Sequence, residues 1–433
     1  MRLRSLVPPQ PIPPRVPRPD GGDLRDNRGM KTTSATPPIE VHASRKQMLG
    51  MSPQDFLRDY WQKHPLLIRG AFPDFVSPVS PEDLAGLACE EAALSRVVKH
   101  QPRGDRWTLK HGPFAESDFA KMGDRDWTLL VQDVDKWDAD VRALLDRFDF
   151  IPRWRIDDVM ISFAAPGGSV GAHVDQYDVF LLQGLGARRW QIDTRANPPT
   201  AFRDDVELKL LREFHPTHTW TLEAGDMLYL PPGVPHHGVA ADACLTYSIG
   251  MRAPSQAELM VDFAEHVAEA LGEDARYADP DLALPKDTHE IDATVLARVR
   301  RALAALQTDD DALATWFGGF ISAYRSAGIA APPKAPSEAA VRKALAAGGS
   351  LARHPFVRTS WTRQGRRALL FAAGETWPMK ADAARTLAAA TVVDTAQFAA
   401  LDADAQAAVV AMTLAGHYVV RKPSARKKIG GRR

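Results

Sequence analysis

The stretch that decides both fold and chemistry reads Gly171-Ala-His-Val-Asp-Gln-Tyr-Asp-Val-Phe180. Its His173 and Asp175 are two residues apart, so on an extended segment both side chains project to the same side. A second histidine, His236, follows in Tyr229-Leu-Pro-Pro-Gly-Val-Pro-His-His-Gly238. Two imidazoles and one carboxylate are the ligand set of mononuclear non-haem iron sites. We therefore expect His173, Asp175 and His236 to bind one metal ion and to form the catalytic centre.

The context of these residues favours a metal site over a chance pattern, because a bare His-x-Asp also occurs in polar loops. Glycines at 167, 168 and 171 allow the chain to enter the segment tightly. His236 follows a proline-rich stretch, 231–235, that predicts a rigid turn and poorly fits a core histidine. The rival ligand His237 points the opposite way from His236 on an extended chain. His215 and His218 lie in a segment with the pattern of an exposed connection.

A second part of the expected pocket begins at the glycine turn before Arg188 and Arg189. Strand alternation puts one of these arginines inside the fold and the other outside. A buried guanidinium needs an anion, and its planar fork matches a carboxylate. A dicarboxylate co-substrate that chelates the metal at one end would offer that carboxylate at the other. Ser162, on the preceding strand, is a candidate donor to the same carboxylate, although an ordinary core serine explains it equally well.

Length and composition bound the class of protein. A chain of 433 residues exceeds one ordinary core, so two or three domains are expected. Charged residues make up 25% at a formal net charge of zero, which gives no overall attraction to nucleic acid or membrane. No apolar run has the length of a membrane span, and no secretion leader is apparent. The two cysteines, Cys89 and Cys244, lack metal-ligand spacing, so we expect a reduced, cytoplasmic protein.

Both ends of the chain have a composition unlike the rest. Residues 1–46 are rich in proline and arginine at their start and are predicted to be disordered. The tail 421–433 carries arginine and lysine without a single acid. A solubilising tail is the favoured interpretation, and a direct nucleic-acid contact is the weaker alternative.

Between the ends, the texture predicts three domains. Short apolar runs cut by glycine and proline indicate a β-sandwich or small barrel within 47–254. Ser255-Gln-Ala-Glu258 has the form of a capping box and opens a helical domain over 255–330. A linker at 330–336 precedes a module over 337–420 in which helices surround a hairpin, a pattern that fits a winged helix. The strands of the barrel are expected at 159–164, 178–183, 189–193, 218–222, 226–230 and 244–250.

These segments resemble the JmjC-type, cupin-like 2-oxoglutarate oxygenases. They look most like the bacterial ribosomal oxygenases, which hydroxylate an arginine of a large-subunit ribosomal protein. The resemblance rests on the following pieces, of which the third is the most specific: Asp157-Asp-Val-Met-Ile-Ser162, Pro166-Gly-Gly168, His173-Val-Asp-Gln-Tyr-Asp-Val-Phe180, Arg188-Arg-Trp190, Tyr229-Leu-Pro-Pro-Gly233, Pro235-His236 and Tyr247-Ser248. It runs from about Tyr60 to Pro254 and continues more weakly to the end.

The resemblance implies an α+β protein: a double-stranded β-helix (jelly-roll) barrel, a helical dimerisation domain and a C-terminal winged helix. It implies Fe(II) bound by His173, Asp175 and His236, with 2-oxoglutarate and O2 as co-substrates. It also implies that Arg188 binds the distal carboxylate of 2-oxoglutarate and that the Ser162 hydroxyl contacts the co-substrate. The implied reaction is 3-hydroxylation of an arginine in the sixteenth large-subunit ribosomal protein, by a homodimer. His237 departs from the pattern, because an acidic residue is expected there.

Two alternatives stay open on the sequence alone. The same barrel could act on another protein residue, such as histidine, or on a small molecule. A cupin joined to a winged helix could also be a regulator without catalysis. A cationic arginine substrate would need acids and aromatic rings at the pocket mouth. Tyr177 and Asp178 are candidates, but the direction of their side chains is not readable from the sequence.

Overall fold

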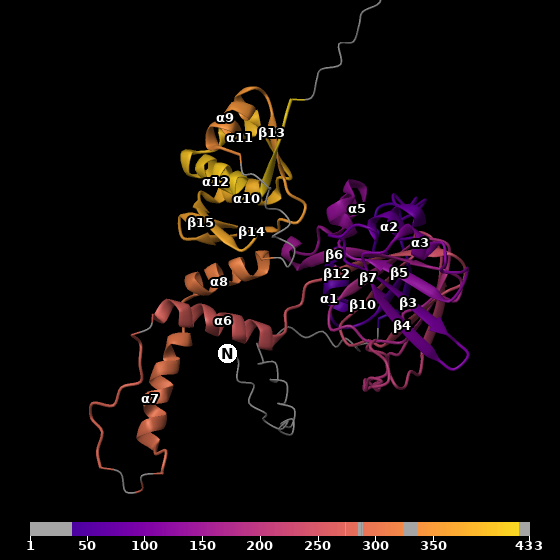
Figure 1. The fold of residues 1–433 in the computed structure, drawn as a ribbon, viewed down its shortest axis with the longest axis horizontal. Coiled ribbons are helices and arrows are strands. Elements are labelled where there is room, and N and C mark those ends of the chain that lie inside the picture. Colours follow the sequence, from indigo (N-terminus) through magenta and orange to yellow (C-terminus); the bar gives the residue numbers. More distant parts are fainter. Residues whose placement is uncertain (1–36, 273, 285–286, 288, 324–335, 424–433) are drawn as a thin grey trace, which may run out of the picture. The chain divides into compact units, whose positions relative to one another are not determined.

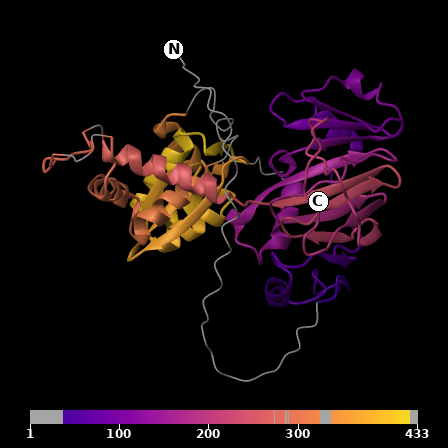
Figure 2. The ribbon, with the colours of Figure 1, turned by 90° about the horizontal axis from the view of Figure 1, so that it is seen from below.

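The structure is a computed structural model that describes residues 37–272, 274–284, 287, 289–323 and 336–423. Residues 38–251 form a β-rich part, which Figures 1 and 2 show in indigo to magenta. Its main sheet has nine strands in the order β1-β2-β10-β7-β12-β6-β5-β3-β4. The bounds of these strands along the chain are β1 Glu40–His42, β2 Leu66–Arg69, β3 Ser95–Gln101, β4 Arg106–His111, β5 Trp127–Val131, β6 Ile156–Ala164, β7 Val179–Leu185, β10 Met227–Leu230 and β12 Cys244–Met251.

A second, smaller sheet packs on the first. It has the order β11-β8-β9, with β8 at Arg188–Ile192, β9 at His218–Leu222 and β11 at His236–Ala240. An apolar cluster joins the two sheets, because it contains Trp190 and Leu222 of the small sheet and Leu181 and Leu228 of the large one. The predicted β-sandwich or barrel texture is thus a pair of facing sheets, with the pocket between them.

Short helices cover the outside of the large sheet. They are α1 Pro53–Asp59, α2 Pro81–Leu87, α3 Glu116–Phe119, α4 Val134–Trp137 and α5 Ala139–Leu144, with two 3-10 turns at Leu145–Phe148 and Arg153–Arg155. Helix α1 is preceded by its N-cap residue Ser52, whose side chain accepts a hydrogen bond from the Asp55 amide. Its Phe56 is fully buried in an aromatic group with Tyr60, Phe180 and Tyr229. This group anchors the N-terminal helix to strands β7 and β10, of which β7 lines the pocket with Val179 and Leu181.

The helical segment after the barrel contains α6 Gln256–Leu271, α7 Ala293–Leu303, a 3-10 turn at Ala304–Leu306 and α8 Asp310–Ser322. The expected capping box at Ser255 and Glu258 is confirmed, since both of its hydrogen bonds form. The end of the expected helical domain, from residue 324, and most of the linker 330–336 lie outside the described residues.

The C-terminal module has its own core, centred on Val341, Leu370, Val409 and Tyr418. Its elements are α9 Glu338–Ala346, β13 Ser350–Arg353, β14 Thr359–Gln364, β15 Arg367–Ala372, β16 Glu375–Met379, α10 Ala381–Ala389, β17 Val392–Asp394, α11 Thr395–Ala400, α12 Ala403–Leu414 and β18 Tyr418–Arg421. Strands β14, β15 and β16 form one three-stranded sheet, and β17, β13 and β18 form another. The expected hairpin is therefore present as β14 and β15, with a third strand, β16, added after Gly374.

Several elements differ from the sequence-based expectation. We expected disorder up to residue 46, but Glu40–His42 forms β1 in parallel with β2. The mixed segment before Phe150 contains the long β3–β4 hairpin, and the stiff turn at His236 is the start of a strand, β11. Strands β1 and β11 pair with partners that are distant in sequence, since sheet pairing is a tertiary property. Strand β4 pairs with its neighbour β3, and β3 also pairs with the later strand β5. The tail's first residue, Arg421, ends β18, while 424–433 lie outside the described residues.

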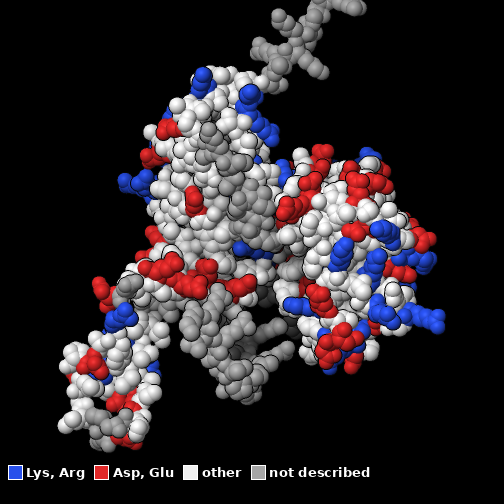
Figure 3. All heavy atoms as spheres, viewed as in Figure 1, with Lys and Arg blue, Asp and Glu red and all other residues white. Residues whose placement is uncertain are grey.

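Charges of both signs are mixed over the face of the β-rich part in Figure 3, which agrees with the net charge of zero. Among the described residues, no helix has the length and apolar character needed to cross a bilayer.

Candidate metal centre and co-substrate pocket

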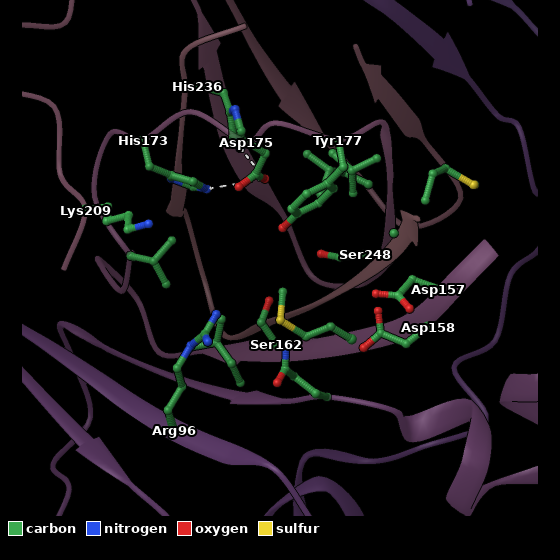
Figure 4. Close-up of a pocket in the computed structure, with 18 of the residues that line it drawn as sticks. Arg96, Asp157, Asp158, Ser162, His173, Asp175, Tyr177, Lys209, His236 and Ser248 are labelled. Carbon is green, nitrogen blue, oxygen red and sulfur yellow. Dashed lines mark ion pairs between the residues drawn. The ribbon is translucent and has the colours of Figure 1, made fainter. Parts of the chain in front are cut away.

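The three predicted metal ligands come together at one end of a pocket of about 690 Å³ (Figure 4). Their ligand atoms all lie within 4.8 Å of one another. The Asp175 Oδ2 atom is 3.9 Å from Nε2 of His173 and 3.7 Å from Nε2 of His236. Within the described part of the chain, these are the residues whose donor atoms can share a metal ion in this way.

The backbone joins the two segments that carry these side chains. The amides of His173 and His236 each donate to the other's carbonyl oxygen, at 3.0 and 2.9 Å. The amide of Gly233, in the proline-rich turn, donates to the carbonyl oxygen of Asp175 at 2.8 Å. Gly171 is required at the entrance, because its φ is +81° and a Cβ there would lie 2.5 Å from the Leu210 side chain. The loop and the turn therefore hold each other in place before any ion binds.

Both histidine rings have the tautomer that a metal ligand needs. Nδ1 of His173 is 3.0 Å from the carbonyl oxygen of Gly171, and Nδ1 of His236 is 2.9 Å from that of Val234. A carbonyl only accepts, so each Nδ1 carries the proton and each Nε2 offers its lone pair to the ion. Burial, and then the neighbouring His173, lowers the pKa of His236 to about 4, so its ring is neutral at physiological pH.

Other histidines of the segment lie outside this group. His237, the rival ligand, is on the other side of β11, with its Nε2 3.0 Å from the Ser169 hydroxyl. His215 pairs with Glu213, and His218 stacks on Trp220. The sequence-based preference for His236 over these three agrees with the geometry.

Arg188 is the buried member of the arginine pair, as strand alternation predicts, and Arg189 is exposed. The Nη1 atom of Arg188 donates to the hydroxyls of Ser162 and Thr246 at 3.2 and 3.3 Å. Its Nη2 donates to the carbonyl oxygen of Gly238 at 3.4 Å. The Nε of Arg188 is buried without a hydrogen-bond partner. Burial lowers the pKa of Arg188, because its described partners are hydroxyl and carbonyl oxygens, which do not compensate the loss of solvation. A guanidinium in this state fits the carboxylate of an added anion.

Gly238 makes this arrangement sterically possible. A Cβ at this position would lie 2.8 Å from Arg188 Nε and from the ring of Trp190. The guanidinium also lies over the Trp190 ring, 5.1 Å from its centroid. Strand β11 therefore supplies one metal-ligand candidate at its start and, two residues on, the open space for Arg188.

The register of β6 and β12 extends the pocket away from Arg188. It aligns three pocket-facing pairs, which from the Arg188 end outward are Ser162 with Thr246, Met160 with Ser248 and Asp158 with Gly250. Tyr177 lines the same outer region, and Figure 4 shows Asp158, Tyr177 and Ser248 facing the cavity. We call these three residues the outer end of the pocket.

Sequence reasoning missed most of the outer end. Of its two candidates, Tyr177 lines the pocket, whereas Asp178 is fully buried and accepts hydrogen bonds from Tyr229, Gln62 and Arg155. Asp158 was available from alternation, because residues 158, 160 and 162 share one face of a strand. Ser248 could not be found in this way without the pairing register.

Comparison with known proteins agrees with this geometry. A JmjC-domain family model matches residues 143–259, and a ROXA-like winged-helix model matches 305–419. The chain is 40% identical to the ribosomal protein uL16 3-hydroxylase of Escherichia coli, over 65% of this chain and 74% of that protein. The chain belongs to the ribosomal oxygenases. A probable ribosomal oxygenase of Haemophilus influenzae is 38% identical over 54% of this chain and 56% of its own length.

Solved structures of ribosomal oxygenases support the same assignment over more of the chain. Escherichia coli YcfD has a TM-score of 0.75 at 34% identity, and the match covers 86% of this chain and 99% of that one. The same protein has also been solved with cobalt and 2-oxoglutarate, with a TM-score of 0.72. The expected family, the JmjC domain and the winged helix are thus confirmed.

Proposed function

We propose that this protein is an iron(II)- and 2-oxoglutarate-dependent hydroxylase that adds one oxygen atom to C3 of an arginine in ribosomal protein uL16. The observation that carries the proposal is the buried Arg188, placed in one pocket with His173, Asp175 and His236. The names of the relatives, a uL16 3-hydroxylase and ribosomal oxygenases, support the substrate class. Acting on a ribosomal protein, the enzyme would work in the cytoplasm.

The donor set fits iron(II), since two neutral imidazoles and one carboxylate leave open positions on one face of the ion. His173, Asp175 and His236 would hold the metal, and Arg188 with Ser162 would hold the far carboxylate of 2-oxoglutarate. When bound, the metal and 2-oxoglutarate supply the activation of O2 that attacks an unactivated carbon. The protein's own residues fix the orientation of both groups through Nδ1–H bonds and the β6–β12 register.

The outer end of the pocket is suited to a guanidinium. Asp158 presents a carboxylate, Ser248 a hydroxyl acceptor and Tyr177 an aromatic ring, which together match a cation with several N–H donors. Burial, and then the nearby Asp175 and Asp158, raises the pKa of Tyr177, so its hydroxyl stays protonated. An arginine bound here would extend its aliphatic part past Met160 toward the metal.

The finer features of the fold follow the same proposal. We infer that the two facing sheets are the double-stranded β-helix of the JmjC family and that the helices after it mediate a homodimer. Helix α7 supports the second point, because it has no buried residue while Leu296, Val299 and Leu303 are 46%, 40% and 57% exposed on one face. A Leu303→Glu variant should shift the protein to a monomer in light scattering, while a Leu284→Glu control should not.

The deciding experiment is incubation of the enzyme with iron(II), 2-oxoglutarate and peptides from large-subunit ribosomal proteins. The proposal predicts succinate formation coupled to the gain of one oxygen atom on arginine, and loss of both in His173→Ala. An oxygen atom gained on histidine instead would move the enzyme to another substrate class. If neither succinate nor hydroxylated product forms with any peptide, a non-catalytic regulator becomes the better explanation.

A further inference from the structure

The buried turn Asp133–Lys136 binds the outer end of strand β6 at three consecutive residues. The Lys136 ammonium donates to the carbonyl oxygen of Asp157 at 3.3 Å. The Asp133 amide donates to Oδ2 of Asp158 at 3.1 Å. The Asp135 carboxylate accepts from the amide of Val159 at 2.9 Å. We call this set of contacts the β6 clip.

The β6 clip takes the place of strand β5, which ends before it reaches the outer part of β6. Strand β5 pairs with β6 from Thr128 opposite Ala164 to Val131 opposite Ile161, and then the chain turns away. The residues of β6 beyond that point therefore need other partners for their polar groups. Asp133 adopts φ +60°, a left-handed conformation that aspartate tolerates, at the start of this turn.

A charge pair inside the β6 clip is buried, although no part of the metal centre uses it. Lys136 and Asp135 form a short ion pair whose side chains are 8% and 3% exposed. The amide of Lys136 also donates to the carbonyl oxygen of Asp133 at 2.7 Å, which closes the turn that aims the Asp133 amide at Asp158. A buried ion pair costs desolvation free energy and is weak evidence for stability alone, so a positional role is a reasonable hypothesis.

The β6 clip leaves half of the Asp158 carboxylate available. Its Oδ2 is held by the Asp133 amide, while in the described part of the chain no donor reaches Oδ1. Gly250, its cross-strand neighbour, keeps this side open, since a Cβ there would lie 3.4 Å from Oδ1. Figure 4 shows the Asp158 carboxylate directed into the cavity.

From these contacts we infer that Lys136 is a positioning residue for substrate selection: through the β6 clip it keeps Asp158 fixed and charged toward the cationic end of the target side chain. This inference rests on the proposed function, which makes Asp158 the receptor of that side chain. Lys136 does not line the pocket, so the sequence motifs of the metal site do not point to it.

The electrostatic surroundings of Asp158 explain why a cation is needed there. Burial, and then Asp133, Asp157 and Asp135, raise the pKa of Asp158 to about 7, while Lys136 acts in the opposite direction. Tyr177 faces it from across the pocket, and Arg358 forms an ion pair with the neighbouring Asp157. Removing the Lys136 charge should therefore leave Asp158 protonated at a pH where it is now ionised.

The test compares Lys136→Met with Lys136→Arg and with Lys110→Met, which removes an exposed lysine paired with Asp118. Peptides carry either the target arginine or citrulline, its uncharged analogue. We expect Lys136→Met to raise KM for the arginine peptide about tenfold, the effect of one charge-assisted hydrogen bond. The kcat at saturating peptide and the KM for 2-oxoglutarate should stay unchanged. The preference for arginine over citrulline should shrink, and the acid limb of kcat/KM should move to higher pH.

Rescue by Lys136→Arg and no effect of Lys110→Met would complete the expected pattern. If Lys136→Met changes only the melting temperature, with KM, the citrulline ratio and the pH profile as in the wild type, the inference is wrong. If Lys136→Met does not fold, Lys136→Gln removes the same charge with a side chain that can still donate to the Asp157 carbonyl oxygen, and it must reproduce the shifted pH profile. Asp158→Asn separates the proposed receptor from the proposed role of Lys136. If Asp158→Asn does not change arginine hydroxylation, Asp158 is not the receptor. If Asp158→Asn changes it but Lys136→Met does not, only the role of Lys136 in the β6 clip is wrong.

Discussion

The two ends of the pocket differ in how the chain builds them. At the metal end, both histidine side chains are held by the backbone of their own segments, through the hydrogen bonds from His173 Nδ1 to Gly171 and from His236 Nδ1 to Val234. At the outer end, Asp158 depends on a turn 25 residues earlier in the chain. Local sequence motifs therefore predict the metal end. The outer end can be predicted only when the strand register is known.

The largest effect is expected at the metal end. Replacing Asp175 by alanine should abolish coupled succinate and product formation, by more than about 100-fold, since even outer partners of metal ligands are worth about 10- to 100-fold in metal affinity. Binding of cobalt(II), followed by its visible absorption, should be lost as well. Full metal binding in this variant would show that the triad is not the metal site.

Arg188→Met tests the other half of the metal end. The substitution removes the buried cation that donates to Ser162 and Thr246, so KM for 2-oxoglutarate should rise about 100-fold, as for two hydrogen bonds to a charged group. Metal affinity should be unchanged, and Arg189→Met serves as the matched control. An unaltered KM for 2-oxoglutarate would remove Arg188 from the co-substrate site.

The outer end should respond in the opposite way. Asp158→Asn keeps the shape of the side chain and removes its charge, so KM for the arginine peptide should rise about 10- to 100-fold. The KM for 2-oxoglutarate should not change. Steady-state kinetics in both substrates would distinguish this result from a general loss of folding, which would affect both constants.

The pH dependence separates the ends further. The pKa of Asp158 is raised to about 7, so this carboxyl is protonated below that pH and loses its attraction for a cation. We expect kcat/KM for the arginine peptide to fall as the pH drops through 7. The fall should be absent for the Asp158→Asn variant, which already lacks the charge, and a persistent fall would assign the limb to another group.

The smallest effect is expected at His237. It lies beside His236 but bonds to Ser169, and its burial lowers its pKa to about 4, so it contributes no charge near neutral pH. His237→Gln should change kcat/KM by less than about tenfold, within the range of one hydrogen bond. Loss of metal binding in this variant would contradict the assignment of His236 as the ligand.

The contrast also explains how far the sequence leads. The triad, the inward Arg188 and the helix starts at Ser52 and Ser255 follow from spacing, alternation and capping, which are local. Strand β11 was missed because its pairing partner, β8, lies far along the chain. The β3–β4 hairpin pairs locally, although β3 also needs the later strand β5 on its other side. Asp158 was visible as a residue, but its neighbours Gly250 and Asp133 become neighbours only through β6, β12 and the turn at 133–136.

The uncompensated Arg188 also links the fold to its co-substrate. A buried guanidinium whose Nε has no hydrogen-bond partner weakens the native state, and an anion that binds there stabilises it by mass action. The lifetime of the protein against proteases would then rise with the concentration of 2-oxoglutarate.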